Sequence, residues 1–303
     1  MSISFSSKTL QSWAALIAGS AVLSFAFSTV GLPASFLVGP MLVAMAFGAR
    51  GTQMSVSRPF LLGAQAVVGV LIARALDPKA LAVIATDWAP ILLVVMTTVF
   101  ASAFAGWLMA RTKLLPGTTA AWGCSPGAAT GMIVMSEQFG ADPRMVALMQ
   151  FLRVVMVVIV ATLVSRLVFG VEAQDLAAGS KAASLAEKLP DILATFGAMA
   201  AGAIAARLSP IPSGGVFLPL MIGAILQGMG FFTITIPPWL IILAFAVIGW
   251  WVGLRFQRST ILYAIKVLPV MLAGVAALIL LCALSAVMLV WLVGTDPLTA
   301  FLA

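Results

Sequence analysis

The chain has 303 residues, of which 63% are hydrophobic and only 8% are charged, and its mean hydropathy is +1.18. A soluble domain carries about 25% charged residues, so this composition excludes the soluble, disordered and coiled-coil classes. The net charge of +7 comes from basic residues near the ends of apolar runs, where the positive-inside rule explains them without any nucleic acid. The composition therefore predicts an all-α polytopic membrane protein.

Nine apolar runs have the length of helices. Because a bilayer core needs about 20 helical residues, the two runs that follow the first predict tilted or partly broken helices. The first run is expected to be a retained helix, since no small-residue cleavage site follows it. The predicted spans are 10–30, 34–49, 59–76, 86–111, 143–169, 190–207, 214–230, 236–255 and 262–293.

Residues 115–141 are too broken for a regular span and too apolar for a surface loop. The segment holds two prolines and five glycines, but only one acid, Glu137. Non-helical backbone at membrane depth is tolerated only where protein or a watery cavity satisfies its polar groups. We therefore predict a re-entrant or discontinuous element, with a break at Ser125, Pro126 and Gly127.

The distribution of charge predicts the topology. If 115–141 enters and leaves on one side and the N-terminus is cytoplasmic, ten basic residues face the cytoplasm and five face the opposite side. This arrangement obeys the positive-inside rule and predicts a multi-pass membrane protein with a cytoplasmic N-terminus. The ten are Lys8, Arg50, Arg58, Arg111, Lys113, Arg144, Arg207, Arg255, Arg258 and Lys266.

The two halves of the chain resemble each other at an offset near 180 residues. Residues 66–69 match 246–249, and Met41 matches Met221. We predict 9–10 transmembrane helices in two repeats, 1–170 and 190–303, joined by an amphipathic linker, 171–189. Five full spans in the first repeat would invert the second, as in many secondary transporters.

The second repeat is shorter than the first in this sequence. The counterpart of the Ser125 break would fall near position 305, and the sequence ends at Ala303. We therefore expect a C-terminally truncated form of a longer protein, while loss of the element from the second repeat is the alternative.

Arg153 is the most informative single residue. It lies about 15 Å along a helix that Asp142 can cap, near the predicted bilayer centre, where a charge must find a partner. Gln150 lies on the same face, one turn earlier. One interpretation is that Arg153 binds an anionic substrate group; the other is an ion pair with Glu137 or hydrogen bonds to carbonyls freed by the break.

Other residues are weaker candidates. Ser125, Pro126, Gly127 and Thr130 would form a substrate cradle at the break, and the alternative is a packing kink. Glu137 is a candidate for proton coupling, or an interfacial acid. Gln65 and Gln227 would line a pathway or bridge helices. The small-residue runs 63–69 and 197–206 are expected to serve close helix packing.

The chain has no histidine, and its two cysteines, Cys124 and Cys282, do not form a CxxC pair. Histidine-ligated metal sites and serine–histidine triads are therefore excluded, and we expect no metal, no cofactor and no enzymatic activity.

Two stretches resemble a known family. They are the run from Trp122 to Met132, WGCSPGAATGM, and the run from Phe139 to Val155, which contains FGADPRMVA and QFLRVV. Both resemble the bacterial AbrB-type membrane protein family. The resemblance implies a duplicated membrane domain, two copies of this stretch and a length near 350. Many members have an acid shortly after the Pro-Gly pair, where this chain has Gly131.

The labels attached to that family are regulation of gene expression and ammonia monooxygenase. A copper monooxygenase would need histidine ligands, which this chain lacks. No soluble basic domain is present to bind nucleic acid, so any regulation would be indirect.

The favoured function is a secondary transporter or permease for a small anionic, carboxylate-like solute, working by alternating access. The alternative is a membrane-bound protein with an indirect role in the regulation of gene expression. The expected partners are the lipid bilayer and the solute, and a homodimer is left open.

Overall fold

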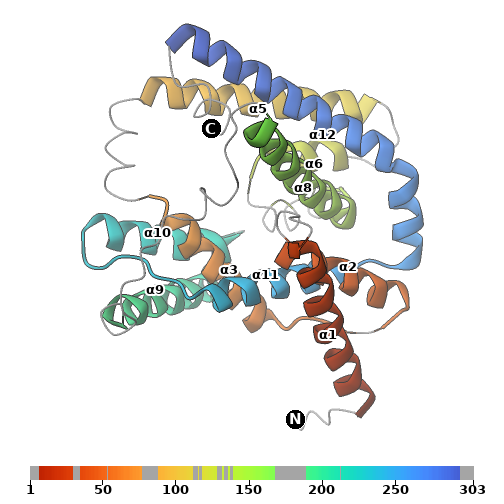
Figure 1. Cartoon of the computed structure of the whole chain (residues 1–303), viewed down its shortest axis with the longest axis vertical. Helices are drawn as coiled ribbons and strands as arrows, with labels where there is room; N and C mark the ends of the chain where they lie inside the picture. The colour runs from red at the N-terminus through yellow and green to blue at the C-terminus, as the bar shows by residue number, and fades with distance from the viewer. Residues whose placement is uncertain are drawn as a thin grey trace. The chain divides into compact units, whose positions relative to one another are not determined.

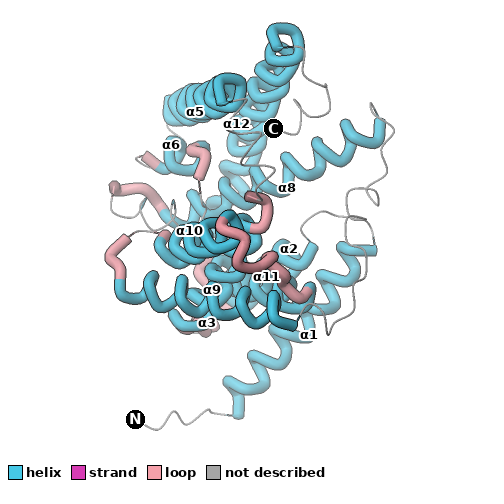
Figure 2. Tube along the Cα trace, turned by 90° about the vertical axis from the view of Figure 1, so that its left-hand side faces the viewer, coloured by secondary structure: helices cyan, strands magenta, loops and turns pink. Residues whose placement is uncertain are grey.

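The computed structural model describes residues 7–29, 35–52, 54–76, 88–111, 115, 118–127, 132, 136, 139–167, 189–211 and 213–293. Within these ranges all regular structure is helical and no strand occurs (Figure 2), which confirms the all-α prediction. Thr130, Glu137 and the linker 171–188 lie outside the described residues. The helices are α1 (Ser7–Thr29), α2 (Ser35–Ala49), α3 (Arg58–Ala73), α5 (Trp88–Arg111), α6 (Thr119–Cys124), α8 (Pro143–Leu167), α9 (Leu189–Leu208), α10 (Gly214–Gly228), α11 (Pro238–Gly253) and α12 (Arg258–Val293).

The helices are apolar on their outer as well as their inner faces. Phe25, Phe100 and Leu208 are 69%, 71% and 80% exposed, and many other large apolar side chains are exposed with them. In the described part of the chain, three stretches are long and apolar enough to cross a bilayer: Leu10–Thr29, Leu189–Leu208 and Arg258–Leu284. Helices that are apolar all round are compatible with a membrane-embedded protein.

The helices α2, α3, α10 and α11 are shorter, with 15 or 16 residues each. At 1.5 Å per residue they are about 22–24 Å long, less than the ~30 Å of a bilayer core. The predicted runs 34–49 and 59–76 form the helices α2 and α3, and neither is interrupted within its described residues. Their predicted tilt in a bilayer stays a prediction.

The chain packs as two compact units, each built from two separate parts of the sequence. Unit 1 comprises Met1–Ala75 with Leu189–Tyr263, and unit 2 comprises Leu76–Lys188 with Ala264–Ala303. Each unit therefore draws helices from both predicted repeats, so a repeat is not a packing unit. The repeat boundaries themselves stay a prediction.

Unit 1 shows the same packing twice. Helix α1 packs on α2 as α9 packs on α10; α2 packs on α11 as α10 packs on α3; and α3 and α11 pack on each other (Figure 1). Both α2 and α10 contain an internal proline, Pro40 and Pro219 respectively. The two sets of three helices, α1–α3 and α9–α11, therefore correspond in these pairs, although α3 also packs on α9 whereas α11 packs much less extensively on α1.

Glycines mark the closest points of this packing. A Cβ on Gly69 of α3 would lie 2.3 Å from the carbonyl oxygen of Val216 on α10, and a Cβ on Gly249 of α11 would lie 2.8 Å from that of Leu37 on α2. Gly249 follows Gly69 by 180 positions, and Val216 follows Leu37 by 179. The close contacts thus recur at the offset of the sequence repeat.

Not every small residue serves close packing. Gly202 of α9 does, since its Cβ would lie 2.5 Å from Pro219 Cα. A Cβ on Gly63 or Gly197 would meet nothing within 4 Å. The prediction that the runs 63–69 and 197–206 pack closely is right for Gly69 and Gly202 but wrong for Gly63 and Gly197, which face open space.

The segment between α10 and α11 is not helical, and side chains satisfy part of its backbone near the buried Ile234 and Ile236. Thr195 Oγ1 accepts a hydrogen bond from the N–H of Thr235 at 3.1 Å. Gln227 Oε1 accepts one from the N–H of Ile234 at 3.1 Å, while its Nε2 donates to the carbonyl of Arg74 at 3.4 Å. Gln227 of α10 therefore connects the end of α3 to this segment. Of its two predicted roles, this is the bridging one.

Unit 2 has an apolar core built from α5, α6, α8 and α12. Met109, Met145, Met149 and Met271 are all at most 4% exposed within it. The flexible thioethers fill gaps left by small residues: a Cβ on Gly123 would lie 2.4 Å from Met149 Sδ. This core fixes α6 against α8, and so positions the break that follows α6.

Candidate functional site

The helix α6 ends where the sequence predicts a break. Ser125 has φ −59° and ψ 132°, an extended conformation, and the helix stops at Cys124. Pro126 explains both facts, because its ring disfavours helical geometry in the preceding residue and it has no N–H to continue the helix. In a continuing helix the N–H of residue 126 would donate to the carbonyl of Trp122. Proline has no N–H, so this carbonyl has no partner within the helix.

Gln150 and Arg153 of α8 supply the missing donors. Gln150 Nε2 donates to the carbonyls of Trp122 and Ser125, both at 3.1 Å. Arg153 Nη1 donates to the carbonyls of Cys124 and Ser125, at 3.3 and 3.2 Å. The end of α6 is thus capped from a neighbouring helix, which satisfies carbonyls that a helix C-terminus leaves free.

The two capping side chains also hold each other. Arg153 Nη2 donates to Gln150 Oε1 at 2.9 Å, so one amide group acts as acceptor for the guanidinium and donor to the backbone. Gln150 is 1% exposed, whereas Arg153 is only partly buried. The negative end of the α6 dipole faces the guanidinium, which is the favourable sign.

The start of α8 is fixed to the start of α6. Asp142 Oδ1 accepts a hydrogen bond from the N–H of Arg144 at 2.9 Å, so the predicted cap of α8 is confirmed. The N–H of Asp142 donates to Thr119 Oγ1 at 3.0 Å, and Thr118 Oγ1 donates to the carbonyl of Phe139 at 3.0 Å. These bonds set the register of α8, which places Gln150 and Arg153 at the α6 break.

Arg153 is surrounded by uncharged acceptors in the part of the site that the structure describes. Within the described residues, the acceptors of Arg153 are two backbone carbonyls and one amide, and none is a carboxylate. The guanidinium has five N–H donors, and the Nε–H has no acceptor among those residues. Carbonyl dipoles stabilise a cation without carrying a full negative charge, so the described part of the site holds no anionic partner for the guanidinium.

The predicted site residues fall into three groups. Ser125, Gln150 and Arg153 meet directly, and Pro126 and Gly127 follow on at the break. Gln65 is elsewhere, in unit 1, where it is buried on α3 against Gly215 of α10. Thr130 and Glu137 lie outside the described residues, so their predicted roles stay predictions.

One of the two alternatives predicted for Arg153, hydrogen bonds to carbonyls freed by the break, is what the described residues show. Sequence reasoning did not say which carbonyls these would be. The carbonyls of Trp122 and Cys124 carry half of the capping bonds, and residue type gives no sign of a carbonyl's role. The signal available was Pro126, since a proline at that position orphans the carbonyl four residues earlier. No group of three or more potential metal ligands occurs among the described residues.

Comparison with known proteins places the chain in a family. The family model described as "Transition state regulatory protein AbrB" matches residues 36–303. The chain is 38% identical over 292 residues to the protein named "Putative regulator AbrB" of Escherichia coli (strain K12), covering 96% of this chain and 83% of that protein. It is 23% identical over 151 residues to "Uncharacterized protein YhjN" of Bacillus subtilis (strain 168), covering 47% of this chain and 39% of that protein. No solved structure matches. The extent of the family match and the identity to the E. coli protein show that this chain belongs to the AbrB family.

Proposed function

We propose that the protein is a polytopic membrane transporter for a small anionic solute, and that the solute binds at Arg153. The observation that carries this proposal is the guanidinium of Arg153, which is partly buried and whose acceptors among the described residues are all uncharged. A carboxylate or similar anion on its remaining donors would supply the missing charge. Gln150 and the α6 break would orient the guanidinium for that contact.

The proposed topology is the one that the distribution of basic residues predicts. The N-terminus lies in the cytoplasm, and the two repeats have opposite orientations. The contacts that recur between α1–α3 and α9–α11 support a duplication. In transporters with inverted repeats, one part rocks against another around a broken helix that holds the substrate. We propose that the broken end of α6 holds the substrate here. We also propose that the protein lies in the bacterial inner (plasma) membrane and has no enzymatic activity. A dimer is compatible with this scheme.

The test is a stability screen of the purified full chain against small carboxylates and inorganic anions. A ligand that binds only the folded state, present at ten times its Kd, raises the free energy of unfolding by about 1.4 kcal/mol. We expect one class of anion to raise the melting temperature of the parent. Arg153→Lys keeps the charge but loses the planar fork, so it should lose most of this shift.

The control is Arg111→Gln. Arg111 is also in unit 2, and its guanidinium stacks on Trp107 at 3.9 Å from the ring centroid rather than on the carbonyls of the α6 break. This variant removes one charge and should keep the anion shift. Anions that stabilise the parent should then be taken up by proteoliposomes that contain it. An anion shift that survives in Arg153→Lys, or no shift with any anion, would overturn the assignment of the site.

A further inference from the structure

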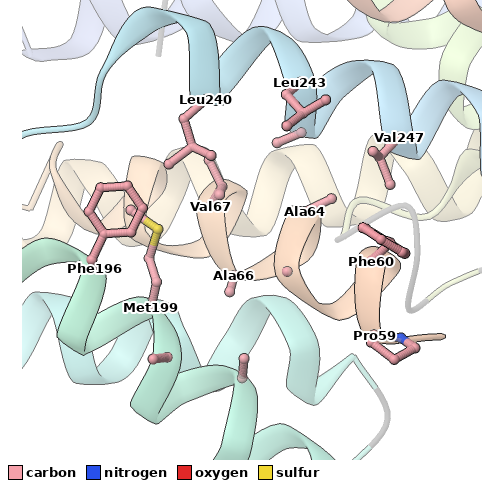
Figure 3. Close-up of a pocket in the computed structure, with 14 residues that line it drawn as sticks. Pro59, Phe60, Ala64, Ala66, Val67, Phe196, Met199, Leu240, Leu243 and Val247 are labelled. Atoms are coloured by element: carbon pink, nitrogen blue, oxygen red, sulfur yellow. The ribbon is translucent and has the colours of Figure 1, made fainter. Parts of the chain in front are cut away.

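Unit 1 contains an apolar groove between α3, α9 and α11, with a volume of about 450 Å³. Its walls include Phe60, Gly63, Phe196, Met199 and Val247, and no charged side chain lines it. Figure 3 shows Phe196, Met199 and Leu240 at the end near Val67, and Pro59 and Phe60 at the other end. The missing side chain of Gly63 is part of what opens the groove, because no neighbour occupies the space where its Cβ would lie.

One end of the groove carries two arginines. A second cavity, of about 340 Å³, is lined by Arg58, Arg207 and four apolar residues, two of which, Pro59 and Ala203, also line the groove. Both guanidiniums are exposed, and within the described residues neither has a hydrogen bond or an ion pair. Arg58 is also the first residue of α3, so its charge adds to the positive end of the helix dipole rather than offsetting it.

The dimensions fit one leaflet of a membrane. From Arg58 to Val67 the α3 wall rises about 14 Å at 1.5 Å per residue, close to half of a ~30 Å bilayer core. An apolar slot of this depth with two cations at its mouth has the chemistry of an acyl chain beneath an anionic headgroup. Basic pockets between helices on the cytoplasmic side are typical binding sites for acidic phospholipids, and both arginines belong to the basic set predicted to lie on that side.

We propose that this groove binds an anionic phospholipid, with one acyl chain along α3, α9 and α11 and the phosphate between Arg58 and Arg207. The site is separate from the anion site at Arg153, which lies in unit 2, and it requires a membrane but no transport activity. The lipid phosphate supplies a negative charge where the described residues place two arginines and no acid.

The experiment compares phosphatidylglycerol with phosphatidylcholine, each added to the purified full chain in detergent. Bound lipids are counted by native mass spectrometry, and the melting temperature is followed as a function of lipid concentration. We expect phosphatidylglycerol to bind more tightly than phosphatidylcholine. Because each arginine near a headgroup contributes about fivefold to affinity, Arg58→Gln with Arg207→Gln should weaken phosphatidylglycerol binding by about thirtyfold.

Two further comparisons distinguish lipid binding in the groove from lipid binding to the charged protein surface. Gly63→Leu places a side chain in the empty groove and should reduce binding of both lipids, whereas Gly197→Leu, on α9 and outside the groove lining, should not. Gly63→Ala is the milder variant if Gly63→Leu does not fold. Arg50→Gln with Arg258→Gln removes the same charge from unit 1 away from both cavities and should leave the lipid preference intact.

Three results would overturn the proposal. Equal stabilisation by the two lipids would mean that the headgroup charge is not recognised. An equal loss of affinity in the Arg50 and Arg258 pair would mean that binding is a diffuse surface effect. Unchanged binding in both Gly63 variants would mean that no acyl chain occupies the groove. Anion binding at Arg153 is measured with water-soluble ligands, so either proposal can fail without the other.

Discussion

The repeated packing of unit 1 makes a sharp prediction about two glycines of the same helix. In Gly69→Ala the new Cβ would lie 2.3 Å from the carbonyl oxygen of Val216, about 1 Å closer than an ordinary van der Waals contact. The obstacle is backbone, which cannot rotate away, so α3 and α10 must separate. Overpacking of this kind costs about 1–3 kcal/mol.

Gly63→Ala is the matched control. It makes the same chemical change on α3, six residues earlier, where a Cβ would meet nothing within 4 Å. Alanine in a helix interior is then favoured over glycine by about 0.5–1 kcal/mol. The two variants should therefore differ by about 1.5–4 kcal/mol, with Gly69→Ala less stable than the parent and Gly63→Ala slightly more stable.

Gly249→Ala extends the test to the other half of the repeat. Its Cβ would lie 2.8 Å from Leu37 O, so its cost should have the same sign as that of Gly69→Ala but a smaller size. The assay is unfolding of the purified protein in mild detergent, by heat and by titration with denaturing detergent, with the parent beside each variant. If Gly69→Ala is as stable as Gly63→Ala, the close α3–α10 contact described above is wrong.

Three other predictions concern unit 2. Gln150→Leu should lower the free energy of unfolding by about 1–3 kcal/mol, because the buried carbonyl of Trp122 loses its donor; a change below 0.5 kcal/mol in the same unfolding assay would contradict the capping role. Ser102→Ala should raise the free energy of unfolding by about 1 kcal/mol, because the buried Ser102 hydroxyl has no hydrogen-bond partner among the described residues and its burial is a net cost. An unfolding titration that shows a loss of stability would contradict this. Two variants that each keep one of the two cysteines can be compared by maleimide labelling. Cys124 is 2% exposed and contacts Met109, so it should react much more slowly than the half-buried Cys282. Equal labelling rates in the two variants would contradict the packing of α6.

The sequence was informative wherever a local rule decides the structure. The end of α6 follows from Pro126, which acts on its immediate neighbours, and the start of α8 follows from Asp142 and Pro143. The apolar runs gave the helices to within a few residues, because little else interrupts them. The sequence left two alternatives for the role of Arg153. Its carbonyl partners lie 28 and 29 residues away in the chain, and their position depends on how α6 packs on α8.

The choice of helix partners could not be predicted in this way. In a soluble protein one polar face of a helix shows which side points outward, but these helices are apolar all round, so periodicity does not identify the buried side. The sequence repeat suggested two halves, whereas the packing units combine helices from both. Likewise, glycine composition gave no means of telling Gly69, which is in close contact, from Gly63, which opens the groove.

The interleaving of the two units has a consequence for how the protein is made. Helices α1–α3 leave the ribosome first, yet α2 and α3 pack on α11 and α10, which are synthesised more than 150 residues later. Unit 1 therefore cannot close until most of unit 2 has been inserted, and its first helices wait with their glycine-lined surfaces unpaired. Contacts this distant in sequence are slow to form and expose the nascent chain to mispairing. Surveillance proteases would meet α1–α3 in this waiting state, so a substitution that slows synthesis of α9–α11 should reduce the amount of protein even where it leaves the finished structure unchanged.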